Sequence, residues 1–229
     1  MPLLSHMHGA RRWSALAVSL LLAGCSSQVI VESSFPSPLV EPLPVRMGIL
    51  IPEELYDYIY TEEIPDQSLW TIALGDANVA MLEPLFAKMF RETHKVDAVP
   101  LAANDGSLDG VLQPTLEKFE FDVTVGERDK FVEVWMQYQL TLYEPNGDTV
   151  VAWPVSGYGK SELGRNREDA VQRAAIVAMR EVGATISTKF AQQPQVSTWL
   201  GEKQHATSVS APADSVPLDA ATVQTQNAR

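Results

Sequence analysis

Residues 131–143 read FVEVWMQYQLTLY, and this stretch determines the predicted fold. Apolar side chains occupy every second position, which is the period of a β-strand with one buried face. The apolar set is Val132, Val134, Met136, Tyr138, Leu140 and Leu142. The next segment, EPNGD at 144–148, has the Pro and Asn-Gly residues typical of a tight turn. We therefore predict a central strand that turns back into a partner strand at about 149–158.

A further strand precedes the central one. Its apolar side chains share one face and alternate with polar residues; they are Phe119, Phe121, Val123 and Val125. The polar segment 126–130 connects this strand to the central strand. The three strands together predict an antiparallel meander with one dry and one wet face.

Two segments with apolar residues at helical spacing can cover the dry face. The second helix is predicted after Asn166, which can act as N-cap. Its apolar stripe consists of Val171, Ala175, Ala178, Val182, Ile186 and Phe190. The small alanines should allow a close approach to the sheet. The first helix is predicted at about 76–91, where Pro84 should kink the helix or delay its start.

Shorter segments complete the domain. They predict a strand at 46–51, a hairpin from about 56–61 and 69–74, and a strand near 96–100. The order of elements predicts an α+β fold: a two-layer sandwich in which an antiparallel meander sheet is covered by two helices, with a hairpin insert. We expect a single α+β domain at 45–200. A Ser- and Pro-rich tether at 25–44 precedes it, and a disordered tail at 201–229 follows it.

The N-terminus carries a targeting pattern. Two arginines precede an apolar run at 13–22, which is too short to span a bilayer and matches the core of a signal peptide. The run ends in LAGC at 22–25, which resembles the lipobox of bacterial lipoproteins. The resemblance implies a signal peptide at 1–24, cleavage between Gly24 and Cys25, and attachment of acyl chains such as palmitate to Cys25. The alternatives are an ordinary signal peptide with a chance cysteine, or a single membrane anchor.

Charge restricts the classes of partner. Removal of 1–24 takes away two arginines and no acidic residue, so the remaining chain has 15 basic and 29 acidic residues, a net charge of −14. Such a chain offers no basic patch for phosphates, and we predict no nucleic-acid partner. Anionic lipid head groups should repel the domain as well. The predicted membrane contact is therefore the lipid at Cys25.

Side chains that could carry catalysis or hold a metal are sparse. Beyond the signal segment the sequence has two histidines, His94 and His205, and Cys25 is the single cysteine. A histidine-activated nucleophile and a zinc site of Cys and His are therefore nearly excluded. GKS at 159–161 lacks the leading glycine of a phosphate loop, and DGSLDG at 105–110 lacks the glutamate that completes a calcium loop. We predict no enzyme, no catalytic residue, no metal site and no cofactor.

The predicted hairpin is rich in aromatic residues. Tyr56, Tyr58 and Tyr60 would share one side of its first strand, and Trp70 lies in the second. One interpretation places these side chains in the core. The other is an exposed face for a partner, since Tyr and Trp are enriched in interface hot spots.

The LAGC motif, the Ser/Pro segment and the order of elements resemble a group of small Gram-negative envelope lipoproteins. This group includes the lipopolysaccharide-assembly lipoprotein and auxiliary lipoproteins of lipid-transporting ABC systems. GYGKS at 157–161 resembles a signature of uncharacterised lipoproteins, and its glycines are predicted to let the strand bend or end. Ser26 lies where an aspartate would favour inner-membrane retention, so the resemblance implies a lipid-anchored protein on the periplasmic face of the outer membrane.

We consider three classes of function. The first is a non-enzymatic accessory or assembly factor that binds another outer-membrane or periplasmic protein. The second is a periplasmic carrier or chaperone for an apolar ligand, as in lipid transport. The third is a hydrolase, against which the missing nucleophile and base count. The sequence does not separate the first two.

Overall fold

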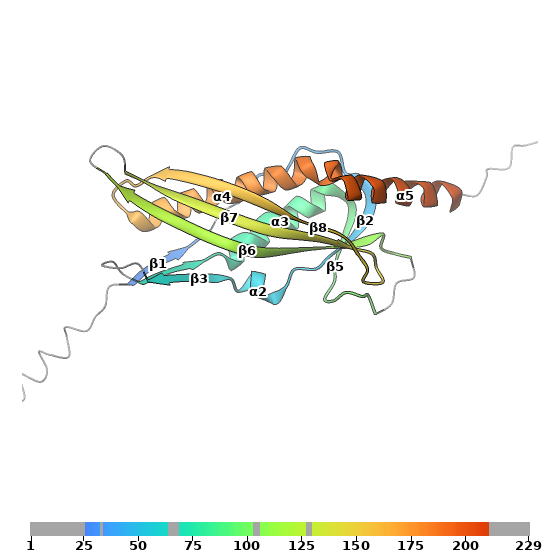
Figure 1. Cartoon of the computed structure of the whole chain (residues 1–229), viewed down its shortest axis with the longest axis horizontal. Coiled ribbons are helices and arrows are strands. Elements are labelled where there is room, and N and C mark those ends of the chain that lie inside the picture. The colour runs from blue at the N-terminus through green and yellow to red at the C-terminus, as the bar shows by residue number, and fades with distance from the viewer. Residues whose placement is uncertain (1–25, 33, 64–68, 103–105, 127–129, 211–229) are drawn as a thin grey trace, which may run out of the picture.

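The computed structural model describes residues 26–32, 34–63, 69–102, 106–126 and 130–210 (Figure 1). Its strands are β1 (Ser26–Ile30), β2 (Leu43–Ile49), β3 (Ile59–Glu63), β4 (Leu69–Ala73), β5 (Phe90–Lys95), β6 (Gly110–Val125), β7 (Lys130–Tyr143) and β8 (Thr149–Glu162). Its helices are α2 (Glu53–Tyr56), α3 (Gly75–Met89), α4 (Arg167–Lys189) and α5 (Pro194–Ser210), with a short 3-10 turn (Phe190–Gln192) between the last two. The predicted α+β class is confirmed.

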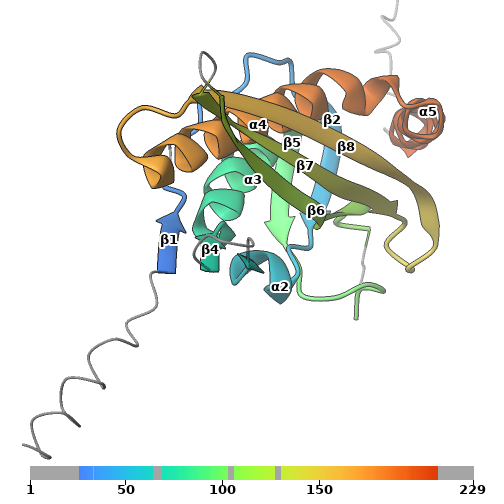
Figure 2. The same cartoon turned by 60° about the vertical axis from the view of Figure 1, so that its left-hand side comes forward.

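A five-stranded sheet forms the main body, with strand order β5-β2-β6-β7-β8. The three long strands β6, β7 and β8 pair antiparallel, which confirms the predicted meander. β2 pairs parallel with both β5 and β6, so the whole sheet is mixed rather than antiparallel. α3 and α4 lie together on one face of this sheet (Figures 1 and 2).

The dry face of β7 lies beneath these helices. All six predicted side chains, Val132, Val134, Met136, Tyr138, Leu140 and Leu142, are at most 2% exposed. Within this core the Tyr138 hydroxyl donates to Asn78 Oδ1 of α3 over 2.5 Å. Asn78 Nδ2 in turn donates to the carbonyl oxygen of Leu55 over 3.3 Å. A buried polar chain therefore connects β7, α3 and α2.

The two long helices form where their apolar spacing predicts them. Asn166 caps α4, since its side-chain oxygen accepts from the backbone N–H groups of Glu168 and Asp169. Every residue of the predicted apolar stripe is buried. α3 begins at Gly75 and continues through the exposed Pro84, so the proline does not delay the start of the helix.

The predicted hairpin belongs to a second, three-stranded sheet with the order β1-β4-β3. β3 and β4 pair antiparallel as predicted, and β1 pairs parallel with β4. The prediction of a tether is therefore wrong for Ser26–Ile30. Val29 and Val31 are buried while Ile30 between them is exposed, so the sequence shows no apolar–polar alternation here, and serines and prolines follow the strand.

Two further boundaries differ from the prediction. The strand expected near 96–100 is β5 at 90–95, a mostly exposed edge strand whose polar sequence gives no apolar signal. The tail expected from 201 onward is helical as far as Ser210, while 211–229 lie outside the described residues. Two contacts hold α5 at the end of β7: the buried Trp199 donates its Nε1–H to Glu144 over 2.9 Å, and Lys203 donates to the same carboxylate over 2.7 Å. Along the described ranges, no helix combines the length and apolar character needed to cross a bilayer.

A candidate site beneath the N-terminal strap

One face of α4 lies directly against β8. A Cβ atom at Gly157 would overlap the carbonyl oxygen of Ala178, and one at Gly159 would overlap that of Ala174. The glycines therefore do not bend or end β8, which continues to Glu162. They allow the helix backbone to contact the strand, and this is the structural role of the glycines in GYGKS.

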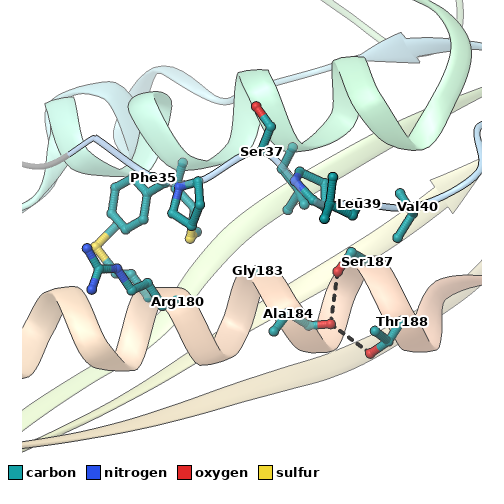
Figure 3. A pocket seen from close by; sticks show the side chains of 14 residues that line it. Phe35, Ser37, Leu39, Val40, Arg180, Gly183, Ala184, Ser187 and Thr188 are labelled. Carbon is teal, nitrogen blue, oxygen red and sulfur yellow. Dashed lines mark hydrogen bonds between the residues drawn. The ribbon is translucent and has the colours of Figure 1, made fainter.

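Another side of α4 is open. Residues 34–42, here called the strap, connect β1 to β2 and pass over α3 and α4 (Figure 3). A groove of about 300 Å³ lies between the strap and the two helices. It is lined by Phe35, Pro36, Ser37, Pro38, Leu39, Val40, Met81, Leu85, Met179, Arg180, Gly183, Ala184, Ser187 and Thr188.

Apolar side chains dominate the walls of this groove. Met81 and Leu85 of α3 and Met179 of α4 are buried at its floor. Leu39 of the strap is fully exposed at the rim. A Cβ atom added at Gly183 would fit without a clash, since it would come no closer than 3.8 Å to the Met81 sulfur.

The polar groups of the groove fall into two kinds. Ser187 and Thr188 donate their hydroxyls to the carbonyl oxygen of Ala184, over 3.0 and 2.7 Å, so these donors are satisfied within the helix. Arg180 carries the single formal charge among the described residues that line the groove. In the part of the chain that the structure describes, no carboxylate pairs with it. Figure 3 places Arg180 beside Phe35, at the opposite end from Thr188.

The sequence did not indicate this groove. The apolar residues of the strap stand between prolines, a composition that predicts a tether. One signal was present: Gly183 interrupts the interior of a long helix, where a glycine is unfavourable and commonly has a packing or functional reason.

The four aromatic residues predicted as a partner face lie against the core. Tyr56 ends α2 and is not part of the hairpin strand. Tyr58 and Tyr60 are half-buried and pack on the core. Trp70 is 1% exposed, with its ring centroid 5.3 Å from that of Phe121, so its placement on an exposed partner face is wrong. Side chains in β4 alternate between faces, and that of Trp70 points inward.

Tyr60 is the most strongly perturbed of the hairpin tyrosines. Its hydroxyl donates to Glu62 Oε2 over 2.8 Å. Burial, followed by this hydrogen bond, raises the pKa of Tyr60 to about 12. The phenol is therefore neutral at physiological pH and acts as a structural donor.

An exposed aromatic pair lies elsewhere, on the wet face of the large sheet. The rings of Trp135 and Tyr158 face each other across β7 and β8 with centroids 5.4 Å apart. Tyr158 donates its hydroxyl to Glu133, and both aromatic side chains remain more than a third exposed. The alternation in 131–143 places Trp135 on the wet face of its strand and gives no signal of the contact with Tyr158.

The predicted lipidation and cleavage residues, Cys25 and Gly24, lie outside the described residues. The first described residue, Ser26, is already part of β1. It pairs with Leu69, the first residue of β4, which in turn pairs with Glu63 at the end of β3. The N-terminal end of the described chain therefore lies at the β3–β4 end of the small sheet.

Comparison with known proteins gives similarity of structure at low identity. No family model matches the chain, and no curated protein matches it. A Xanthomonas campestris protein of the DUF330 family aligns over 79% of this chain and 99% of its own, with 9% identity and a TM-score of 0.47. A Helicobacter pylori protein described as a neuraminyllactose-binding hemagglutinin homologue aligns over 76% and 100%, with 13% identity and a TM-score of 0.44.

A minor lipoprotein of Acinetobacter baumannii aligns over 68% of this chain and 94% of its own, with 9% identity and a TM-score of 0.39. The solved structures that resemble this chain thus include a lipoprotein of a Gram-negative bacterium.

Proposed function

We propose that this protein is a lipoprotein anchored at the periplasmic face of the outer membrane, where it acts as a non-enzymatic accessory or assembly factor for another envelope component. The observation that carries the proposal is the start of β1 at Ser26, the residue directly after Cys25 of the LAGC motif. A lipid at Cys25 would then join the folded domain without a spacer. Two or three acyl chains are sufficient for stable anchoring.

This arrangement gives the domain a defined orientation. The β3–β4 end of the small sheet would face the bilayer, and the exposed Leu69 lies at that end. α5 and the β7–β8 turn lie toward the opposite end of the molecule (Figure 1). The proposed protein therefore works close to the membrane surface and presents its far end to the periplasm.

The exposed pair Trp135 and Tyr158 supports the binding of a partner. Tyr and Trp contribute most to interface hot spots, and a wet sheet face bearing two exposed rings offers such a contact. The half-buried hairpin tyrosines support this role less, since they pack on the core.

The second candidate function, a carrier for an apolar ligand, is favoured by the groove beneath the strap. The groove is largely apolar and lies between elements, as small-molecule sites commonly do. The two functions are compatible in one molecule.

A labelling experiment tests the anchor. Cells that express the wild-type protein or Cys25→Ala are grown with a clickable palmitate analogue, and the envelope is then fractionated. We expect label and outer-membrane recovery for the wild type and loss of both for the variant, because no other thiol can accept the lipid. Label retained on Cys25→Ala would refute the lipoprotein proposal.

Crosslinking in the native envelope, followed by mass spectrometry, tests the partner. Trp135→Ala should weaken the crosslinked complex while the protein still folds, whereas Gln139→Ala on the same sheet face should not. An undiminished complex with Trp135→Ala would exclude this pair as the partner contact.

A further inference from the structure

We propose that the groove beneath the strap binds a single acyl chain of an anionic amphiphile, and that Arg180 holds its head group. This inference rests on the second candidate function and names its ligand class. It is independent of whether Cys25 is lipidated. The occupant is a free single-chain amphiphile such as a fatty acid, rather than a bilayer surface.

The dimensions of the groove fit one chain. Its α4 wall extends from Arg180 to Thr188, which corresponds to about 12 Å along a helix. Its volume of about 300 Å³ lies at the lower end of ligand pockets and leaves no room for a two-chain lipid. The strap covers the groove along one side, so a chain could lie parallel to α4 (Figure 3).

The walls are suited to an acyl chain. Met81 and Met179 are unbranched and adaptable, and such side chains accommodate flexible apolar ligands. Leu39 is fully exposed at the rim, and a bound chain would remove part of its apolar surface from water. Ser187 and Thr188 already donate within α4, so they impose no requirement for a polar ligand.

The positive charge at one end of the groove favours an anionic ligand. Arg180 is the one charged residue among the described lining residues, and none of the carboxylates that the structure describes pairs with it. A guanidinium binds a carboxylate or phosphate through two parallel hydrogen bonds. The chain as a whole is strongly acidic, so an anion would find little other attraction on the protein.

Photocrosslinking of the full-length lipidated protein tests the proposal. The protein is reconstituted in phosphatidylcholine vesicles with either a fatty acid that carries a diazirine in its chain or the corresponding fatty alcohol. We expect the fatty acid to label strap and helix residues of the groove, Leu39, Met81 and Met179 among them. The alcohol should label them about tenfold less, since it loses a charge-assisted hydrogen bond.

Three variants locate the site. Gly183→Leu should fill the groove and abolish its labelling, and the substitution replaces a helical glycine by a good helix former. Gly201→Leu is the matched control, because Gly201 is also helical and has nothing within 4 Å of an added Cβ; its labelling should stay unchanged. Arg180→Gln should retain labelling but remove the preference for the acid. Melting curves of all three establish that they fold.

Several outcomes would overturn the proposal. They are equal labelling by acid and alcohol in the wild type, unchanged groove labelling in Gly183→Leu, and labels confined to the membrane-proximal residues around Ser26 and Leu69. The last pattern would indicate bilayer contact alone. Absence of groove labelling in the wild type, with palmitate incorporation at Cys25 intact, would refute the ligand site and leave the anchored function standing.

Discussion

The two sides of α4 differ in how closely its backbone is covered. Toward β8, Gly157 and Gly159 bring strand and helix backbones into direct contact, with no space for even a Cβ atom. Toward the strap, Gly183 faces a groove in which a Cβ atom would meet only ordinary contacts with Met81 and Leu85. The absence of a side chain at Gly157 and Gly159 therefore lets β8 pack tightly on α4, whereas its absence at Gly183 leaves room beneath the strap. The difference lies in whether a rigid backbone or flexible side chains lie opposite.

The largest expected effect is on the closed side. Gly159→Val would force side-chain atoms into the Ala174 carbonyl, so helix and strand must separate. We expect the free energy of unfolding to fall by about 3 kcal/mol or more, at the upper end of overpacking effects. Urea denaturation measures the change. Ser156→Val, on the exposed face of the same strand, should leave stability nearly unchanged; a similar loss there would contradict the close-contact explanation.

An intermediate effect is expected between the sheet and α3. Tyr138→Phe removes the hydroxyl that donates to Asn78 and leaves the buried amide oxygen without its donor. We expect a loss of about 1–3 kcal/mol, the cost of an unsatisfied buried polar group. Tyr158→Phe is the matched control, since the hydrogen bond from this tyrosine to Glu133 is exposed, and the variant should melt like the wild type. Equal melting temperatures for the two variants would show that the buried pair contributes little.

The smallest effect, with the opposite sign, is expected on the open side. Gly183→Ala adds a methyl group at ordinary van der Waals distance from Met81 and Leu85 and restricts the unfolded chain, so the protein should gain about 0.5–1 kcal/mol of stability. Thermal denaturation checks the sign. A loss of stability would show that the strap and helices already fill the space at Gly183.

The parts of the fold that the sequence predicted are those with long, regular apolar periods. β6, β7 and the stripe of α4 repeat an apolar residue often enough to fix element type and buried face together. β1 and β5 were missed or displaced because each has five or six residues, few of them buried. Their pairing depends on partners distant in sequence. Short edge strands carry little local information.

The candidate site was harder to predict for a similar reason. Its walls come from the strap, α3 and α4, which are distant in sequence. The position of α4 depends on its close packing against Gly157 and Gly159 of β8. The spacing of residues in the sequence does not show which helix residues these glycines contact. Trp70 is the opposite case, a residue that the sequence offered for a partner face and that the structure places in the core. An aromatic residue in a short strand fits core and interface equally well in sequence, and only the tertiary contact with Phe121 decides between them.

Thiol accessibility tests most directly whether α4 has one open and one closed side. Gly183→Cys places a thiol on the groove side of α4, and Val182→Cys places one on the side packed against β8. The wild type measures any reaction of Cys25. We predict that a maleimide modifies Gly183→Cys rapidly in the native protein, that the fatty acid slows this reaction, and that Val182→Cys reacts only after unfolding. Equal protection of both positions in the native protein would contradict the open groove and the ligand site proposed there.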